Sequence, residues 1–297
     1  MRLQPFTVLP IVSICLLAVC PLSQAGLMTF TQVQDFNTLA HGAIVSSSNP
    51  AQTLLGSFGN VTVSGENFND DRDLIVGFDT ALGSGTRDDD LLAPFDLGNI
   101  GGLDVDIEGA GDEQGTALII QERGEGSDNN NDGLLDSSSG SDAPADDEGR
   151  RPAGSISFDF DEAVESFGID LLDVEGGENF SFEFFSDGEL VSTVGFDEFL
   201  EGGEFFDPSA PVVFGNNSAN RIVPITTEEL AAFAGVDSIS GFDSVTVNLG
   251  GSGALDNLLT TRSFVPEPGA ACLWMMAGAI GLCGFERRKS NRINKLI

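Results

Sequence analysis

The strongest constraint on the fold is a two-residue alternation of apolar and polar side chains in the middle of the chain. The alternation covers residues 155–160, 166–171 and 180–184. Asp187 and Gly188 then mark a hairpin turn into a further strand over residues 190–196. Because successive side chains of a strand point to opposite faces of the sheet, this pattern predicts half-buried antiparallel strands.

Shorter strand signals occur elsewhere, and helix signals are scarce. Further strands are predicted at residues 28–36, 61–63, 74–78, 117–122 and 244–249, each bounded by Gly, Asn or Asp. One helix is predicted at residues 227–233, with Thr226 or Thr227 as its N-cap and Glu228 and Glu229 in its first turn. Many short strands predict an all-β, jelly-roll-like antiparallel β-sandwich rather than a βαβ fold.

The body of the chain reads as one domain, residues 26–262, with a core built from phenylalanine. The chain has 23 Phe and no Tyr, and we see no internal repeat of fixed period. The Gly-, Ser- and Asp-rich stretch over residues 124–151 then reads as a long acidic loop that leaves the sandwich.

The C-terminus combines three features in a fixed order. The first is a short segment of Pro266, Glu267 and Pro268, and the second is an apolar run over residues 270–285. The third is a basic cluster of Arg287, Arg288 and Lys289. As a helix, residues 269–285 would span ~25 Å, slightly under the roughly 30 Å hydrocarbon core of a membrane. The basic cluster marks the cytoplasmic side, so a transmembrane helix is predicted with everything before Pro266 outside the membrane.

This tripartite tail resembles the PEP-CTERM sorting signal of exported proteins in Gram-negative bacteria. The resemblance covers residues 263–297, and residues 290–297 run past the arginines after which the family usually stops. It implies that an exosortase-type enzyme of the inner membrane recognises Pro266, Glu267 and Pro268 together with Arg287 and Arg288, and cleaves the tail. An ordinary C-terminal membrane anchor is the alternative, and it gives the same topology.

The N-terminus independently predicts export. Residues 1–25 read as a signal peptide, with Arg2 as the positive charge, an apolar run over residues 8–19 and cleavage between Ala25 and Gly26. A lipoprotein signal ending at Cys20 is disfavoured, because Val19 stands where a small residue is usual. We therefore expect an exported protein of the cell envelope or extracellular space, held initially in the inner membrane by its C-terminal helix.

Cysteine placement and charge exclude several functions. The four cysteines lie in the leader and the tail, so the body has no thiol nucleophile and no thiolate zinc site. Between residues 26 and 264, 45 acidic side chains oppose seven arginines, which gives a net charge of −38. Nucleic acid is therefore excluded as a partner, because binding it requires clustered Lys and Arg. The acidic balance favours solubility and attraction of divalent cations.

Residues 128–136 have the spacing of a calcium-binding loop. Oxygen-bearing side chains occupy positions 1, 3, 5 and 9, a carbonyl is available at position 7 and glycine allows the turn at position 6: Asp128, Asn130, Asp132, Asp136, Leu134 and Gly133. Position 12 is Ser139 instead of Glu, so the loop looks more like those of dockerin-like and thrombospondin-type repeats than an EF-hand.

Calcium is the cofactor that this loop predicts. The missing carboxylate could come from one of four acidic residues, Asp142, Asp146, Asp147 or Glu148. The alternative is a flexible acidic loop that has the same spacing, since Asn-Asp-Gly sequences are common in plain turns.

Other candidate residues carry weaker signals. Two further acidic clusters are Asp70, Asp71 and Asp73, and Asp88, Asp89 and Asp90. Asp256 resembles the acidic residue in the final strand of carbohydrate-binding jelly rolls that holds a structural calcium. His41 is the one histidine, so a catalytic triad would have to be built around it, and a surface-loop histidine is the simpler interpretation.

The sequence thus predicts a non-enzymatic, calcium-stabilised envelope or matrix protein with a role in adhesion or in association with exopolysaccharide. Its expected partners are the exosortase-type enzyme, the membrane and a polysaccharide. An extracellular carbohydrate-binding module and a polysaccharide hydrolase with two carboxylates are the alternatives. The body has neither Trp nor Tyr, the usual sugar platforms, which weakens the carbohydrate-binding alternative.

Overall fold

A computed structural model describes residues 28–49, 54–80, 91, 115–124, 126–136, 145–208, 211–212, 214–215 and 218–264. The chain divides into two compact units, one of Thr29–Arg262 and one that combines Met1–Met28 with Ser263–Ile297. Only residues 28, 263 and 264 of the second unit are described.

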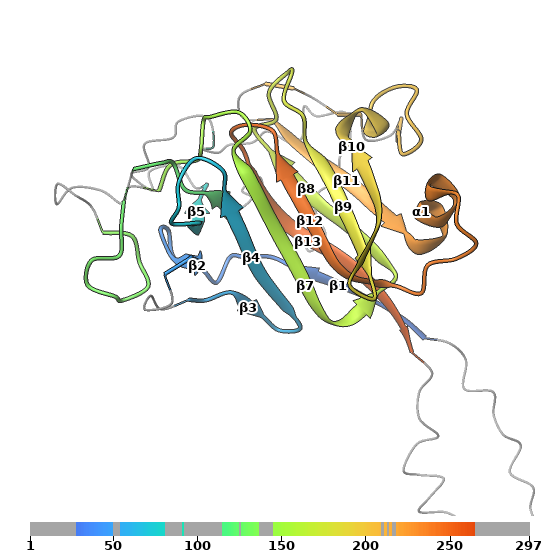
Figure 1. Cartoon of the computed structure of the whole chain (residues 1–297), viewed down its shortest axis with the longest axis horizontal. Helices are drawn as coiled ribbons and strands as arrows, with labels where there is room; N and C mark the ends of the chain where they lie inside the picture. Colours follow the sequence, from blue (N-terminus) through green and yellow to red (C-terminus); the bar gives the residue numbers. More distant parts are fainter. Residues whose placement is uncertain are drawn as a thin grey trace, which may run out of the picture. The chain divides into compact units, whose positions relative to one another are not determined.

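The first unit is an antiparallel β-sandwich of two sheets (Figure 1). The larger, seven-stranded sheet consists of β1 (Met28–Gln34), β2 (Ile44–Ser46), β5 (Ile75–Asp79), β6 (Thr116–Ile120), β8 (Ser166–Leu172), β11 (Ala219–Thr226) and β13 (Ala254–Phe264). Its strand order is β11-β8-β13-β6-β5-β2, and β1 pairs with β13 beside this path. The all-β prediction is confirmed.

The smaller, six-stranded sheet has the order β10-β9-β12-β7-β4-β3. Its strands are β3 (Ser57–Phe58), β4 (Val61–Asn67), β7 (Gly154–Val164), β9 (Ser181–Ser186), β10 (Glu189–Gly195) and β12 (Phe242–Leu249). A short 3-10 helix, η2 (Phe196–Phe199), follows β10, and one α-helix, α1 (Thr227–Ala234), follows β11. Both of these helical segments lie outside the sheets, as Figure 1 shows.

Phenylalanine rings fill the space between the two sheets. Phe167 of β8 is fully buried and meets rings of the opposite sheet, with centroid distances of 6.0 Å to Phe158, 6.3 Å to Phe182 and 6.0 Å to Phe184. The contacts with Phe182 and Phe184 are edge-on, the arrangement that the ring quadrupole favours. Aromatic contacts therefore connect the two sheets through the core.

A second apolar cluster covers the outer face of the larger sheet. Leu172 of β8 and Ala254 of β13 pack there against Leu135, Ala145 and Leu91, which come from loops. As a result every residue of β8 is buried, although its alternating sequence predicts a half-buried strand. The prediction was wrong in this respect, because Asp170 and Ser166 are hydrogen-bonded to side chains of the neighbouring strands, Arg221 and Thr261, instead of facing solvent.

The hairpin predicted at Asp187 and Gly188 joins β9 to β10. Both residues have positive φ, 54° and 75°, as a two-residue turn that matches strand twist requires. The pairing of Glu189 with Ser186 closes the turn directly. The prediction from the Asp-Gly pair is confirmed.

Helix α1 begins and ends at the signals that the sequence contains. Thr226 is the N-cap: its hydroxyl accepts the N–H of Glu229 at 3.2 Å, and the Glu229 carboxylate accepts the N–H of Thr226 at 2.9 Å. Gly235 ends the helix with a φ of 69°. The predicted helix is confirmed, one residue longer than expected.

Four strands were not predicted, namely β2, β3, β11 and β13. β2 and β3 have only three and two residues, too few to show an alternation. β11 contains Pro224, which argues against a strand, and β13 is interrupted by Asn257, which has a φ of 48°. In both strands the register shifts at the interruption, so the apolar period breaks where the chain remains in the sheet.

The outer strands of the two sheets are short or bulged. β2 and β3 end one side of each sheet order and are the shortest strands. β10 and β11 end the other side, and each carries a register shift, between Leu190 and Ser192 in β10 and between Ile222 and Ile225 in β11.

Candidate functional site

The loop of residues 128–136 is fastened to the β2 end of the larger sheet. Ile44 donates its N–H to the Gly133 carbonyl at 2.8 Å, and Leu135 donates its N–H to the Gly42 carbonyl at 2.9 Å. Leu135 inserts into the second apolar cluster and is 6% exposed. Both ends of the turn are thus held by the sandwich.

A second attachment holds the segment that leads into this loop. The Arg72 guanidinium pairs with the Asp70 carboxylate and also donates to the Gly126 carbonyl, while Gly124 donates its N–H to Asp70 at 3.0 Å. The hydrogen bonds and charge of Arg72, with the N–H of Gly124, lower the pKa of Asp70 to about 2. Asp70 therefore organises the loop through Arg72.

Asp128 shapes the turn through its own backbone. Its Oδ1 accepts the N–H of Asp132 at 3.0 Å and its Oδ2 accepts the N–H of Gly133 at 3.1 Å. The residue is 7% exposed. Asp132 in turn accepts the N–H of Leu134 at 2.9 Å. Three of the predicted ligands, Asp128, Asp132 and Leu134, thus lie within one tight turn.

The Asn130 side chain joins two of the predicted ligands. Its amide Nδ2 lies 3.0 Å from Oδ2 of Asp132 and 3.3 Å from Oδ1 of Asp136. One partial positive charge therefore lies between two carboxylates that the sequence spacing assigns to a cation. Asp136 is fixed further by the N–H groups of Asn129 and Asn130, at 2.6 and 3.2 Å from its Oδ2.

Two of the four residues considered for the missing carboxylate are engaged elsewhere. Asp147 accepts the N–H of Gly253 at 2.5 Å, and Glu148 accepts the N–H groups of Arg123 and Arg150. Several other candidates lie outside the described residues: Ser139, Asp142, Asp88, Asp89 and Asp90.

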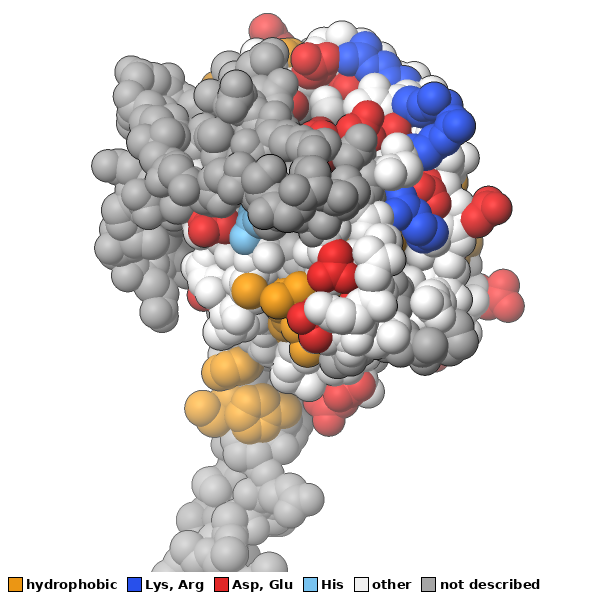
Figure 2. All heavy atoms as spheres, turned by 90° about the vertical axis from the view of Figure 1, so that its left-hand side faces the viewer, with side chains coloured by type: hydrophobic (Ala, Val, Ile, Leu, Met, Phe, Trp, Pro, Cys, Tyr) orange, Lys and Arg blue, Asp and Glu red, His pale blue; other side chains and the backbone are white. Residues whose placement is uncertain are grey.

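Within the described residues, no three or more His, Cys, Asp or Glu side chains are grouped so that they could hold a metal ion. Figure 2 shows acidic side chains spread over the visible face instead of gathered at one point. The carboxylates of the 128–136 loop accept backbone N–H groups in this arrangement.

A buried polar cluster lies on the larger sheet, and only Asp256 in it was considered from the sequence. Asp170 of β8 and Arg221 of β11 form two parallel hydrogen bonds of 2.7 Å each. Asn257 donates its side-chain N–H to Asp170 at 2.9 Å, and Asp256 lies directly across from Asp170 in the strand register. Asp256 is fully buried, and its Oδ2 has no hydrogen-bond partner.

Burial governs the protonation of both carboxyls. It raises the pKa of Asp170, although the hydrogen bonds and charge of Arg221 oppose the shift. It raises the pKa of Asp256 well above its usual value, and the neighbouring Asp170 adds to the shift. The resemblance of Asp256 to the acidic residue in the final strand of carbohydrate-binding jelly rolls was the one sequence signal for this cluster.

His41 lies in a structural contact. Its Nδ1 accepts the N–H of Asp79 at 3.1 Å, and its ring packs edge-on against Phe78 with a centroid distance of 5.3 Å. The imidazole nitrogen that a triad would orient through a carboxylate is therefore held by backbone.

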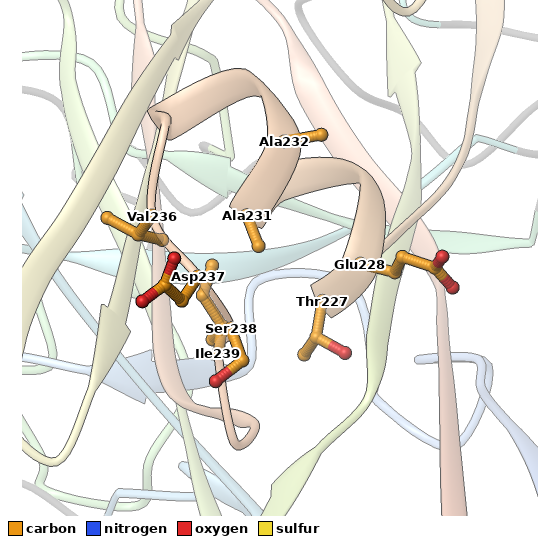
Figure 3. A pocket seen from close by; sticks show the side chains of 8 residues that line it. All are labelled: Thr227, Glu228, Ala231, Ala232, Val236, Asp237, Ser238 and Ile239. Atoms are coloured by element: carbon orange, nitrogen blue, oxygen red, sulfur yellow. The ribbon is translucent and has the colours of Figure 1, made fainter.

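A pocket of about 420 Å³ lies between α1 and the loop that follows it. Its lining residues are Thr227, Glu228, Ala231, Ala232, Val236, Asp237, Ser238 and Ile239. Figure 3 shows the Glu228 carboxylate directed away from Asp237. The pocket therefore does not oppose two carboxylates, as glycoside hydrolysis requires.

The predicted export and sorting residues lie outside the described residues. These are Ala25, Gly26, Pro266, Glu267, Pro268, Arg287 and Arg288. Among the residues that are described, no helix combines the length and apolar character of a membrane span. The segment in which the transmembrane helix is predicted, residues 270–285, is not among them.

No known protein family model and no curated protein matches this chain.

Proposed function

We propose that this is an exported protein of the cell envelope or extracellular matrix, whose β-sandwich is stabilised by calcium and which acts in adhesion or in association with exopolysaccharide. The observation that carries the calcium part is the Asn130 amide, which contacts both Asp132 and Asp136 in a loop fastened to the sandwich. The proposed export and localisation rest on the sequences of the two chain ends, residues 1–25 and 263–297.

Calcium suits this loop because its carboxylates keep acceptor capacity. A carboxylate has about four lone-pair sites, so the two or three N–H groups that Asp128, Asp132 and Asp136 each accept leave at least one site for a cation. The hydrogen bonds from the N–H groups of Asp132 and Gly133 to the Asp128 carboxylate hold the turn. This turn brings the proposed ligands near one another in space. Asp128, Asn130, Asp132, Asp136 and the Leu134 carbonyl would hold the ion, with oxygen ligands of the kind that calcium prefers.

The sandwich is proposed to be of the jelly-roll kind. The chain passes from one sheet to the other after β2, β4, β6, β7, β8, β10, β11 and β12. Repeated crossing of this type is typical of double-sheet Greek-key folds. The 128–136 loop is attached beside β2, the strand that ends the order of the larger sheet.

The proposed route begins with a signal peptide, residues 1–25, and ends with a sorting segment, residues 263–297. The segment would anchor the chain in the inner membrane until an exosortase-type enzyme acts near Pro266. The described unit of Thr29–Arg262 lies between these two segments, so it would be the part that is exported.

Replacing Arg287 and Arg288 by Gln is expected to leave a larger, membrane-held form, because the basic residues complete the sorting signal and fix the orientation of the helix. The size and location of the protein are measured by immunoblotting of membrane, periplasmic and extracellular fractions. Replacing Arg262 by Gln, just before the sorting segment, is the control. Mature protein of normal size from the Arg287 and Arg288 variant would contradict the sorting assignment.

Calcium is expected to raise the melting temperature of the full-length protein in detergent, and the variant Asp132→Asn with Asp136→Asn is expected to lose this rise. At a calcium concentration of 100 times Kd, binding adds about 2.7 kcal/mol to the stability. Asn preserves the size and the acceptor oxygen but removes two charges. Differential scanning calorimetry over a calcium titration measures the effect.

The matched control replaces two exposed carboxylates elsewhere, Asp187→Asn with Asp237→Asn. It changes the net charge equally and is expected to retain the full calcium response. An equal loss in both variants would show that calcium acts through the overall charge, and an unchanged response in the loop variant would move the site to other residues.

A further inference from the structure

The strongly acidic body gathers most of its few arginines on one side. The region from residue 26 to 264 has seven arginines, and four of them belong to the segments around the 128–136 loop: Arg72, Arg123, Arg150 and Arg151. Figure 2 shows blue side chains collected along one border of the face, and both lysines of the chain lie in the C-terminal tail. These blue side chains are therefore arginines.

A buried carboxylate holds two of these arginines together through their backbone. Glu148 is 1% exposed, and its Oε2 accepts the N–H of Arg123 at 3.0 Å while its Oε1 accepts the N–H of Arg150 at 3.0 Å. The backbone of Glu148 is itself tied to the Ile120 carbonyl of β6 at 2.9 Å. One rigid group attached to the sheet thus fixes both arginine positions.

The side chains of Arg123 and Arg150 keep their charge for an external partner. Both residues are exposed, and within the described part of the chain neither guanidinium forms an ion pair. By contrast, Arg72 pairs with Asp70, and Arg151 pairs with Glu175 and Glu178. Among the described residues, Arg123 and Arg150 thus combine a backbone anchored on Glu148 with a guanidinium group that forms no ion pair.

The chemistry of the pair selects an anionic ligand with spaced charges. A guanidinium fork matches the two oxygens of a carboxylate or sulfate group. Nucleic acid carries one charge per ~1.7 Å and needs many cations to bind, which this border lacks. A polysaccharide with an acidic group on its sugars offers separate anions that two arginines can bind.

We propose that Arg123 and Arg150 form the contact site for an acidic polysaccharide that carries carboxylate or sulfate groups. This inference rests on the proposed association with exopolysaccharide and names the class of polymer and the residues that bind it. The 128–136 loop follows Arg123 closely in the chain, so a cation bound there would reduce the negative potential along the same border.

The test measures binding of the full-length protein in detergent to polygalacturonate, dextran sulfate and neutral dextran by affinity electrophoresis. The variant Arg123→Gln with Arg150→Gln is expected to bind the acidic polymers with an affinity lower by about tenfold or more, since two charge-assisted contacts are lost. Preference for polygalacturonate or for dextran sulfate identifies which anion the site takes. Neutral dextran is expected to be bound by neither protein.

The control variant Thr193→Asp with Ser238→Asp alters the net charge by the same amount at exposed positions of β10 and of the loop after α1. It is expected to bind like the wild type. Equal weakening in both variants would overturn the inference in favour of a general charge effect, and so would equal binding of dextran. Loss of self-association by the arginine variant in sedimentation velocity, with polymer binding unchanged, would assign the border to a second copy.

Polymer binding and the melting temperature are each measured with added calcium and with a chelator. The two measurements together distinguish this inference from the proposed function. Arginine-dependent binding without a calcium-induced rise in melting temperature would support the site and overturn the calcium assignment. A calcium-induced rise with an arginine variant that binds like the wild type would overturn the site alone. Absence of binding to every polymer would overturn both the site and the association with polysaccharide.

Discussion

Replacing Arg221 by Leu is expected to destabilise the protein by about 3–5 kcal/mol at neutral pH, because it leaves the Asp170 carboxylate buried without its cation. The Asp170 side chain is 2% exposed and makes both of its short hydrogen bonds of 2.7 Å to Arg221. Urea unfolding of the full-length protein measures the loss. A loss below about 1 kcal/mol, the size of an exposed ion pair, would contradict this account.

The loss from Arg221→Leu is also expected to shrink in acid. Without Arg221, the folded pKa of Asp170 rises further above its unfolded value, so the folded state binds more protons than the unfolded state between the two values. Stability then falls as pH rises through that window, and it recovers below the unfolded pKa. The double variant Asp170→Leu with Arg221→Leu is expected to recover much of the stability at neutral pH, because no charge remains buried.

Asp256→Asn is the matched control for disturbing this cluster. The folded pKa of Asp256 is raised by burial, so the wild-type carboxyl lowers stability progressively as pH rises above the unfolded pKa. The amide removes this cost, and the variant is expected to gain stability over the wild type as pH rises. A gain that does not depend on pH would show that Asp256 is not the titrating group.

Replacing Phe167 by Ala is expected to cost about 3–5 kcal/mol, because the side chain is fully buried at the centre of the contacts between the sheets. Three rings of the opposite sheet, Phe158, Phe182 and Phe184, contact it, and none can fill the space without leaving its own position. Urea unfolding and thermal melting of the variant measure the loss.

Phe68→Ala is the control for the phenylalanine prediction. Phe68 is 49% exposed, so its removal is expected to change stability by no more than about 0.5 kcal/mol. A comparable loss in Phe68→Ala and Phe167→Ala would mean that the rings between the sheets do not dominate the core. Phe167→Leu retains most of the apolar volume and is expected to lie between these two extremes.

The elements that the sequence predicts best are those whose determinants are local. The capping residues of α1, the Asp187-Gly188 turn and the alternation of β7 and β9 depend on neighbours a few residues away. β11 and β13 could not be recognised in the same way, because Pro224 and Asn257 break their period and only pairing with β8 keeps them in the sheet. The burial of both faces of β8 likewise depends on contacts between distant segments.

The candidate sites also differ in whether their determinants are local in the sequence. The spacing of residues 128–136 is local, and the sequence alone suggests their common role. The pairing of Asp170 with Arg221 joins residues 51 positions apart, and Glu148 binds the N–H of Arg123 from 25 positions away. No periodic pattern encodes such contacts, so the buried ion pair and the arginine border become apparent only in three dimensions.

The bulges in β10 and β11 have a consequence for a protein that would accumulate outside the cell. An outer strand with regular, free N–H and C=O groups is a template on which other chains can polymerise into fibrils. The register shifts between Leu190 and Ser192 and between Ile222 and Ile225 interrupt that template, and β2 and β3 are too short to offer one. These four strands therefore offer little regular backbone on which a second copy could add a strand.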